Sequence, residues 1–224
     1  NNGENDPSFT AHIITTSADG AYSIYAVDVN GDGYMDVLSA SYDDDKIAWY
    51  KNDGNENFTT HIISTSANEA VSVFSVDVNG DGYMDVLSAS HDDDKIAWYE
   101  NDGNENFTPR IISTSASHAF SVYAVDLDGD GDIDVLSASG KDDKIAWYEN
   151  EGSINFIAHN VNRPDTDGGP NTNEGDADVP ESVYAVDVDG DGDIDVLSAS
   201  RDDNKISWYE QENVSVSSVS YIKR

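Results

Sequence analysis

A fifteen-residue stretch, VDVNGDGYMDVLSAS, occupies residues 27–41 and recurs without change at residues 76–90. Two close variants follow at residues 125–139 and 186–200. The first residues of the four copies, at positions 27, 76, 125 and 186, are therefore 49, 49 and 61 residues apart. A period of roughly 40–50 residues indicates a repeat protein, in which each repeat is one supersecondary unit. We therefore expect four similar units within a single domain spanning residues 1–224.

Aromatic residues follow the same period. The tryptophans, spaced like the acidic stretches, are Trp49, Trp98, Trp147 and Trp208. The phenylalanines, spaced evenly by 49 residues, are Phe9, Phe58, Phe107 and Phe156. The 12 additional residues (61 minus 49) must lie between Phe156 and the last acidic stretch. The segment NRPDTDGGPNTNEGDADVP at residues 162–180 is rich in proline, glycine and aspartate, which predicts an inserted surface loop there.

Each unit contains four short apolar runs separated by acidic or glycine-rich turns. In the second unit these runs are AVSVFSVDV, MDVLSAS, KIAWYEN and FTPRIIST. They predict strands, and no segment has the 3.6-residue periodicity of a helix. The run IAWY is apolar on both strand faces, which is typical of a sheet covered on both sides. The predicted fold is all-β: a β-propeller of about four four-stranded blades, with units near residues 21–66, 70–115, 119–161 and 182–224.

Two segments compete for the outermost strand of the last unit. A predicted N-terminal strand at residues 8–15, containing FTAHIIT, would close a four-bladed ring by overlapping with the C-terminal strands. The tail NVSVSSVSYIKR at residues 213–224 also alternates like a strand and would fill the same position. In that case the N-terminal strand would pair in another chain or in another part of the protein, and both alternatives remain open.

The stretch DVNGDGYMD at residues 28–36 places oxygen-bearing side chains at its positions one, three, five and nine. Gly33 at position six permits a sharp turn, and the carbonyl of Tyr34 at position seven offers one more oxygen. Ca²⁺ takes six to eight hard oxygen ligands, so the pattern predicts a calcium site. The predicted ligands of the four acidic loops, with position seven acting through its carbonyl, are Asp28, Asn30, Asp32, Tyr34 and Asp36; Asp77, Asn79, Asp81, Tyr83 and Asp85; Asp126, Asp128, Asp130, Asp132 and Asp134; and Asp187, Asp189, Asp191, Asp193 and Asp195.

The alternative is that aspartate, asparagine and glycine simply form good turns. A turn does not require an aspartate at position nine, so four copies with identical spacing favour calcium. Magnesium fits less well because it demands strict octahedral geometry and keeps its waters. About four Ca²⁺ ions, one per repeat, would change the formal net charge from -34 to -26 (-34 plus 8). The expected role of the ion is structural, holding the turn between the two inner strands of each blade.

The four acidic loops match the pattern D-x-[DN]-x-D-G-x-x-D, and the chain thereby resembles the FG-GAP/VCBS repeat family over nearly its whole length. The resemblance implies a calcium-binding β-propeller like those of integrin α-subunits, secreted lectins and microbial surface proteins. Neither FG nor GAP occurs in the sequence, so the VCBS-like branch is the closer match. The loops also begin like an EF-hand, but they lack its glutamate at position twelve and its flanking helices.

Composition excludes several classes of function. Eleven basic residues against 45 acidic ones give a formal net charge of -34, which repels nucleic acid and anionic membranes. The sequence has no cysteine and no apolar run near the roughly 18 residues of a membrane helix. No serine lies in a G-x-S-x-G motif, so nucleophilic catalysis has no support. We expect the tryptophans to pack between blades rather than to stack on sugars.

These observations predict a secreted, extracellular or cell-surface calcium-binding propeller. It would be a non-enzymatic recognition or adhesion module for a glycan or surface protein. One alternative is a structural subunit whose terminal strands exchange between chains, building an oligomer or a fibre. Another is an accessory domain of a polysaccharide-active enzyme. The sequence begins NNGENDPSF, without an initiator methionine, so we expect a mature or excised segment whose export signal has been removed.

Overall fold

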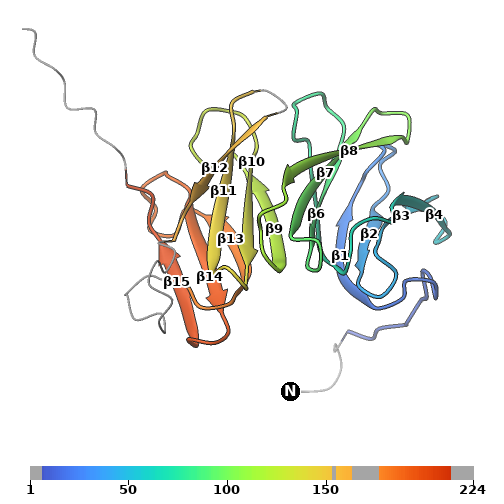
Figure 1. Ribbon diagram of the computed structural model, residues 1–224. Helices are drawn as coiled ribbons and strands as arrows, with labels where there is room; N and C mark the ends of the chain where they lie inside the picture. Colours follow the sequence, from blue (N-terminus) through green and yellow to red (C-terminus); the bar gives the residue numbers. More distant parts are fainter. Residues whose placement is uncertain (1–6, 153–154, 163–176, 213–224) are drawn as a thin grey trace, which may run out of the picture.

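The computed structural model describes residues 7–152, 155–162 and 177–212, and this part of the chain contains fifteen β-strands and no helix. The strands form four antiparallel sheets, one per repeat, which we call blades 1 to 4. Figure 1 shows the blades standing next to one another in sequence order. The all-β prediction with 49-residue units is confirmed. Within the same described residues, no helix has the length and apolar character needed to cross a membrane.

Every blade runs from an inner strand outward in sequence order. Blade 1 contains β1 (Ala21–Val27), β2 (Asp36–Ser41), β3 (Lys46–Asn52) and β4 (Phe58–Ser64). Blade 2 contains β5 (Ala70–Val76), β6 (Asp85–Ser90), β7 (Lys95–Asn101) and β8 (Phe107–Ser113). Blade 3 contains β9 (Ala119–Val125), β10 (Asp134–Ser139), β11 (Lys144–Asn150) and β12 (Phe156–Asn160). The described strands of blade 4 are β13 (Pro180–Val186), β14 (Asp195–Ser200) and β15 (Lys205–Tyr209).

The strand register is the same in every blade and decides which side chains share a face. Leu38 on β2 lies opposite Tyr25 on β1 and Trp49 on β3. Because side chains alternate along a strand, Leu38 and Trp49 share one face, and Val37 and Tyr50 share the other. We call the Leu/Trp face, which meets the next blade, the trailing face. The Val/Tyr face, which meets the preceding blade, is the leading face.

The hydrophobic core lies between the blades, in three separate clusters. Between blades 1 and 2, Leu38, Ile47 and Trp49 of one trailing face pack with Val73 and Tyr99 of the next leading face. The same repeat positions form the cluster between blades 2 and 3 and the one between blades 3 and 4. This arrangement explains why IAWY is apolar on both faces. It also confirms the expected packing role of the tryptophans at Trp49 and Trp98, which are fully buried.

Polar contacts repeat at each blade interface as well. The backbone N–H of Val73 donates to Ser23 Oγ across the first interface at 3.4 Å. The equivalent serines at the next two interfaces accept from Val122 at 3.2 Å and from Val183 at 3.3 Å. In the turn between β2 and β3, Asp45 Oδ1 accepts the backbone N–H of Glu69 at 2.8 Å. Hydrogen bonds at fixed repeat positions therefore set how each blade docks on the next.

The predicted strand at residues 8–15 is not a strand in the structure. Phe9 is exposed, and the segment lies along the leading face of blade 1, where Ile14, Val37 and Tyr50 line an open groove of about 400 Å³. The described residues therefore do not show the predicted closure by this strand. The reason is geometric: β15, its expected partner, lies at the other end of the row of blades (Figure 1). The tail at 213–224 and residues 163–176 of the predicted insertion lie outside the described residues.

We expect Leu87→Ala to lower the free energy of unfolding by about 2–5 kcal/mol, because it leaves a cavity at a fully buried position between blades 2 and 3. Urea denaturation followed by tryptophan fluorescence measures the loss. The control is Ile111→Ala on the exposed outer strand β8, which should change the value by less than about 1 kcal/mol. Equal losses in the two variants would contradict a core located between the blades.

Candidate metal sites

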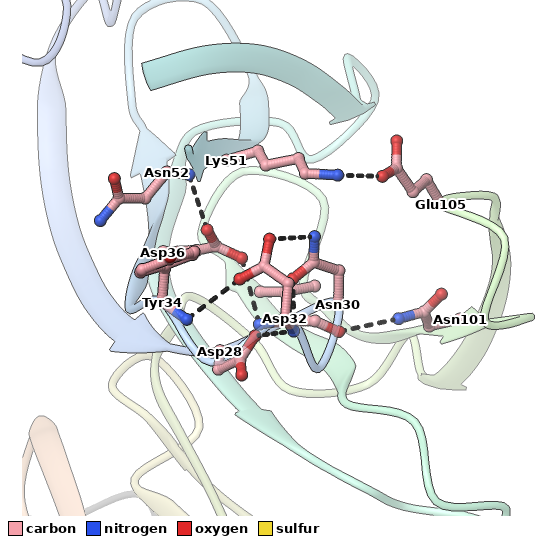
Figure 2. Close-up of polar contacts among 10 residues, drawn as sticks. Asp28, Asn30, Asp32, Tyr34, Asp36, Lys51, Asn52, Asn101 and Glu105 are labelled. Atoms are coloured by element: carbon pink, nitrogen blue, oxygen red, sulfur yellow. Dashed lines mark hydrogen bonds and ion pairs between the residues drawn. The ribbon is translucent and has the colours of Figure 1, made fainter. Parts of the chain in front are cut away.

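An acidic loop joins the two inner strands of every blade, β1 to β2 in blade 1 and the equivalent strands in the others. Gly31 and Gly33 of the first loop have φ angles of 72° and 91°. These left-handed conformations favour glycine, which confirms the turn-forming role predicted for Gly33. Figure 2 shows the oxygen-bearing side chains of the first loop gathered on the inside of the turn.

Backbone N–H groups hold the carboxylates at positions one and five of the first loop. Asp28 accepts from Gly33 at 2.7 Å and from Asp32 at 3.1 Å. Asp32 Oδ1 accepts the N–H of Tyr34 at 3.0 Å, and its Oδ2 accepts the side-chain amide of Asn30 at 2.9 Å. The second loop repeats these bonds. The loop is thus folded around its carboxylates at positions one and five.

The aspartate at position nine is buried, and its carboxylate forms hydrogen bonds both within the loop and to the third strand. Asp36 Oδ2 accepts the backbone N–H of Val29 at 3.2 Å, and its Oδ1 accepts that of Asn52 at 2.7 Å. Its counterparts make the same two bonds in the other blades, at Asp85, Asp134 and Asp195. The residue therefore ties the start of the loop to the end of the third strand. A carboxylate oxygen has two lone pairs, so an oxygen that accepts one N–H can also bind a cation.

Burial raises the pKa of Asp85 and of Asp134 to about 6, although the backbone N–H bonds act in the opposite direction. Burial also acts to raise the pKa of Asp195, in the last blade. There the hydrogen bonds from the Gln211 and Val188 backbones and from the Trp208 side chain together outweigh it, and the pKa lies below its usual range. The difference agrees with the position of Asp195 in the end blade, which has a neighbour on one side within the described residues.

Loops 3 and 4 bring three carboxylates together. In loop 3, oxygens of Asp126, Asp128 and Asp130 lie within 4.8 Å of one another, and in loop 4 the same holds for Asp187, Asp189 and Asp195. Burial raises the pKa of Asp128, and the nearby charges of Asp130, Glu149 and Asp126 add to the rise. A bound cation would remove this repulsion. The donors are all hard oxygens, so the residues fit Ca²⁺.

Loops 1 and 2 carry an asparagine at position three, Asn30 and Asn79, so among positions one, three, five and nine each offers one carboxylate fewer than loops 3 and 4. The other predicted ligands lie in the same loops, and their part in binding an ion stays a prediction. That includes the position-seven carbonyls of Tyr34, Tyr83, Asp132 and Asp193 and the side chain of Asp191. The ring of Tyr34 lies against Gly54, where an added Cβ would come within 2.4 Å of it.

Asparagines for which the sequence predicted no role connect the loops to the next blade. The Asn101 side-chain amide donates to Met84 O at 3.0 Å in its own blade and to Val29 O at 3.4 Å in the first acidic loop. Asn150 repeats this pair of bonds one blade later. Lys51 and Glu105 form an ion pair of 2.5 Å across the same interface (Figure 2). The signal in the sequence was an asparagine at the same place in three of four repeats.

Comparison with known families gives a match over most of the chain. The model of the FG-GAP-like repeat matches four overlapping segments, residues 1–39, 28–88, 77–137 and 126–198. This result supports the FG-GAP side of the resemblance, whereas the VCBS-like branch stays a prediction. A search of curated protein sequences finds no significant match.

Solved structures with this arrangement of blades share little sequence with the chain. A lectin of Agrocybe aegerita, described as recognising non-reducing terminal N-acetylglucosamine, is 15% identical with a TM-score of 0.53, covering 80% of this chain and 47% of its own. A candidate 6-phosphogluconolactonase of Bacteroides fragilis is 14% identical with a TM-score of 0.55, covering 86% and 51%. One from Bacteroides uniformis is 16% identical with a TM-score of 0.54, covering 84% and 50%. The likeness shows the fold, and this chain spans about half the length of each of the three.

In calcium-free protein, we expect the Asp85 carboxyl group to titrate with a midpoint near pH 6, because burial disfavours its charge. The folded pKa exceeds the unfolded value of about 3.9, so the folded state binds the proton more tightly. The stability that this group contributes is present below about pH 4 and is lost as the pH rises through about 6. Carboxyl ¹³C chemical shifts measured against pH give the midpoint.

Asp102 serves as the internal control for this titration. It lies exposed in the β7–β8 turn, where hydrogen bonds from the Asn106 side chain and the Asn104 backbone hold its pKa below the usual range. A midpoint for Asp85 as low as that of Asp102 would show that the position-nine carboxylate is not shielded from water.

Proposed function

Because this chain belongs to the FG-GAP-like repeat family, we propose that it is a secreted β-propeller module of the VCBS-like branch, stabilised by calcium. Its role is to recognise a glycan or a surface protein without catalysing a reaction. The observation that carries the proposal is the acidic loop that recurs four times with a buried aspartate at position nine, and whose carboxylate oxygens converge in loops 3 and 4.

Calcium is the first element of the proposal. In each loop the side chains at positions one, three, five and nine and the carbonyl at position seven would hold one ion, which supplies positive charge where the carboxylates crowd. A fixed loop stabilises the junction of the two inner strands. Extracellular modules bind Ca²⁺ with dissociation constants of about 10⁻⁴–10⁻³ M. Such weak sites fill outside the cell, so an extracellular or cell-surface location is part of the proposal.

Recognition is the second element, and we place it on the edge of the blades that carries the acidic loops. The turn between the third and fourth strands lies on the same edge, since alternate connections of an antiparallel sheet share an edge. Tyr34 and Tyr83 are about half exposed there, and aromatic rings offer stacking surfaces for a sugar. Glycan recognition by the Agrocybe lectin supports a ligand of this class, although the two chains share the fold alone.

Calcium is expected to raise the free energy of unfolding of the native chain by about 2–3 kcal/mol per site at a hundredfold excess over the dissociation constant. Asp126→Asn should remove one of about four ions in isothermal titration calorimetry and reduce this stabilisation. The control, Asp92→Asn, changes an exposed aspartate in the β6–β7 turn and should leave both values unaltered. Unchanged stoichiometry in Asp126→Asn would contradict the assignment of the loop.

Ligand recognition is tested by applying the labelled chain to glycan and surface-protein arrays, with calcium and then with a chelator. We expect calcium-dependent binding, and we expect the double change of Tyr34 and Tyr83 to alanine to weaken it at least about tenfold, as loss of aromatic contact residues does. Ile111→Ala, on the outer strand β8, is the control. If the double change left binding unaltered, the ligand would not bind at this edge. Turnover of a bound glycan would contradict a non-enzymatic role.

A further inference from the structure

We propose that two copies of this chain join head to tail into one eight-bladed ring. The trailing face of blade 4 in each copy packs on the leading face of blade 1 in the other. The proposal rests on the packing of the described residues and does not depend on the identity of any bound ion or ligand.

The trailing face of blade 4 has the composition of a buried face but no covering blade among the described residues. Ile206 is 80% exposed, whereas its counterparts Ile47, Ile96 and Ile145 are 0% exposed. Trp208 is 45% exposed, against 0% for Trp49. The residue types at these positions are the same in all four blades. The sequence of blade 4 is therefore that of a blade with a following neighbour.

The leading face of blade 1 shows the complementary feature. Ile24 on β1 is 76% exposed, whereas the valines at its position, Val73, Val122 and Val183, are 4–5% exposed. Ala21 is also exposed, although Ala70 at the same position of blade 2 is completely buried. One chain thus leaves the β1 part of an apolar leading face uncovered at one end, while Ala48 and Tyr50 farther out on that face are buried, and it leaves an apolar trailing face uncovered at the other end.

These two kinds of face already meet three times within the chain, which shows that they are complementary. The hydrogen-bonding groups of the interior interfaces are retained at the ends. Ser182 stands where Ser23 accepts from Val73, so its hydroxyl would accept the N–H of Ile24 in the second copy. Asn52 stands where Asn101 donates to Val29 O, so its amide would reach Val188 O. The interface between two copies would therefore use the same kinds of contact as the three interfaces within one chain.

The N-terminal segment is already held in the place that this assembly requires. Lys46 Nζ donates to Ser17 O at 2.9 Å, as Lys95 does to Ser66 O at 2.6 Å after the outer strand of blade 1. Residues 9–15 therefore run along blade 1 as β4 runs along blade 2. They occupy the position of a fourth strand from a preceding blade, and β15 of the second copy lacks a fourth strand among the described residues.

Aromatic contacts indicate how this strand would dock. Trp49 stands in edge contact with Phe107 of the next blade at 6.2 Å, and Trp98 with Phe156 at 6.4 Å. Trp147 lines an open groove of about 380 Å³ beside blade 4, and the Phe that would fill it by repeat spacing is Phe9 of the second copy. The tail at 213–224 contains no phenylalanine. The same register would place His12 on Trp208, as His61 lies on Trp49 at 4.6 Å.

This chain covers 47–51% of the length of three solved structures with this fold, so a second copy would bring the assembly to about their full length. A head-to-tail contact that closes under two-fold symmetry leaves no apolar face exposed, whereas one that does not close builds a filament.

The test is the molar mass of the native chain by light scattering, at about 0.15 M salt to screen its charge. We expect twice the 24.3 kDa of one chain. Ile24→Glu and Ile206→Glu should each give a folded monomer by circular dichroism, because both positions are exposed in the single chain. Mixed in equal amounts, the two variants should form a weaker dimer through the one interface that is unaltered. Ile111→Glu, on the exposed outer strand β8, is the matched control and should remain dimeric.

A second variant tests the N-terminal strand. Phe9→Ser should weaken the dimer by about tenfold or more, as truncation of a buried interface aromatic does, without changing the circular dichroism of the single chain. An unchanged dimer in this variant would overturn the strand contact.

Three other outcomes would overturn the ring. A monomeric mass for the native chain would mean that the faces are covered within one chain or stay open. A larger polymer would mean head-to-tail contact without closure. If Ile24→Glu were monomeric and Ile206→Glu stayed dimeric, blade 1 would pair with its own copy instead.

Discussion

The structure depends on one packing relation, the docking of a Leu/Ile/Trp trailing face on a Val/Ala/Tyr leading face. Each blade is a thin sheet that is apolar on both sides, so it is stable only when water is excluded from both faces. Leu87 and Trp98, for example, are buried because blade 3 covers the trailing face of blade 2. A single blade buries neither face. Stability therefore resides in pairs of neighbouring blades, as in other repeat architectures, and the two ends of the row are the weakest places.

The acidic loops and the blade interfaces are connected through shared residues. The position-nine aspartate belongs to the loop by sequence, yet its carboxylate fixes the end of the third strand through Asn52 in blade 1. The side chain of Asn101 then links the first loop to blade 2. Because the same atoms set loop shape and blade docking, anything that orders a loop also orders an interface.

Much of this architecture follows from the sequence. The predicted run KIAWYEN is strand β7 at Lys95–Asn101. The period of the tryptophans correctly predicted which positions are buried between blades 1, 2 and 3. The local sequence pattern could not predict that both oxygens of Asp36 accept backbone N–H groups, because the two donors lie on different elements. It also failed at residues 8–15. Their pattern is that of a strand, but a strand needs an edge to pair with, and the number of blades that completes a circle is encoded in no single repeat.

The near identity of the interfaces has a consequence for how such a chain changes over evolutionary time. Since any trailing face fits any leading face, insertion or deletion of one 49-residue unit creates no unmatched surface inside the row. The chemistry of the interfaces therefore does not fix the number of blades. That number is set by geometry, as the number of units at which the two ends of an assembly meet.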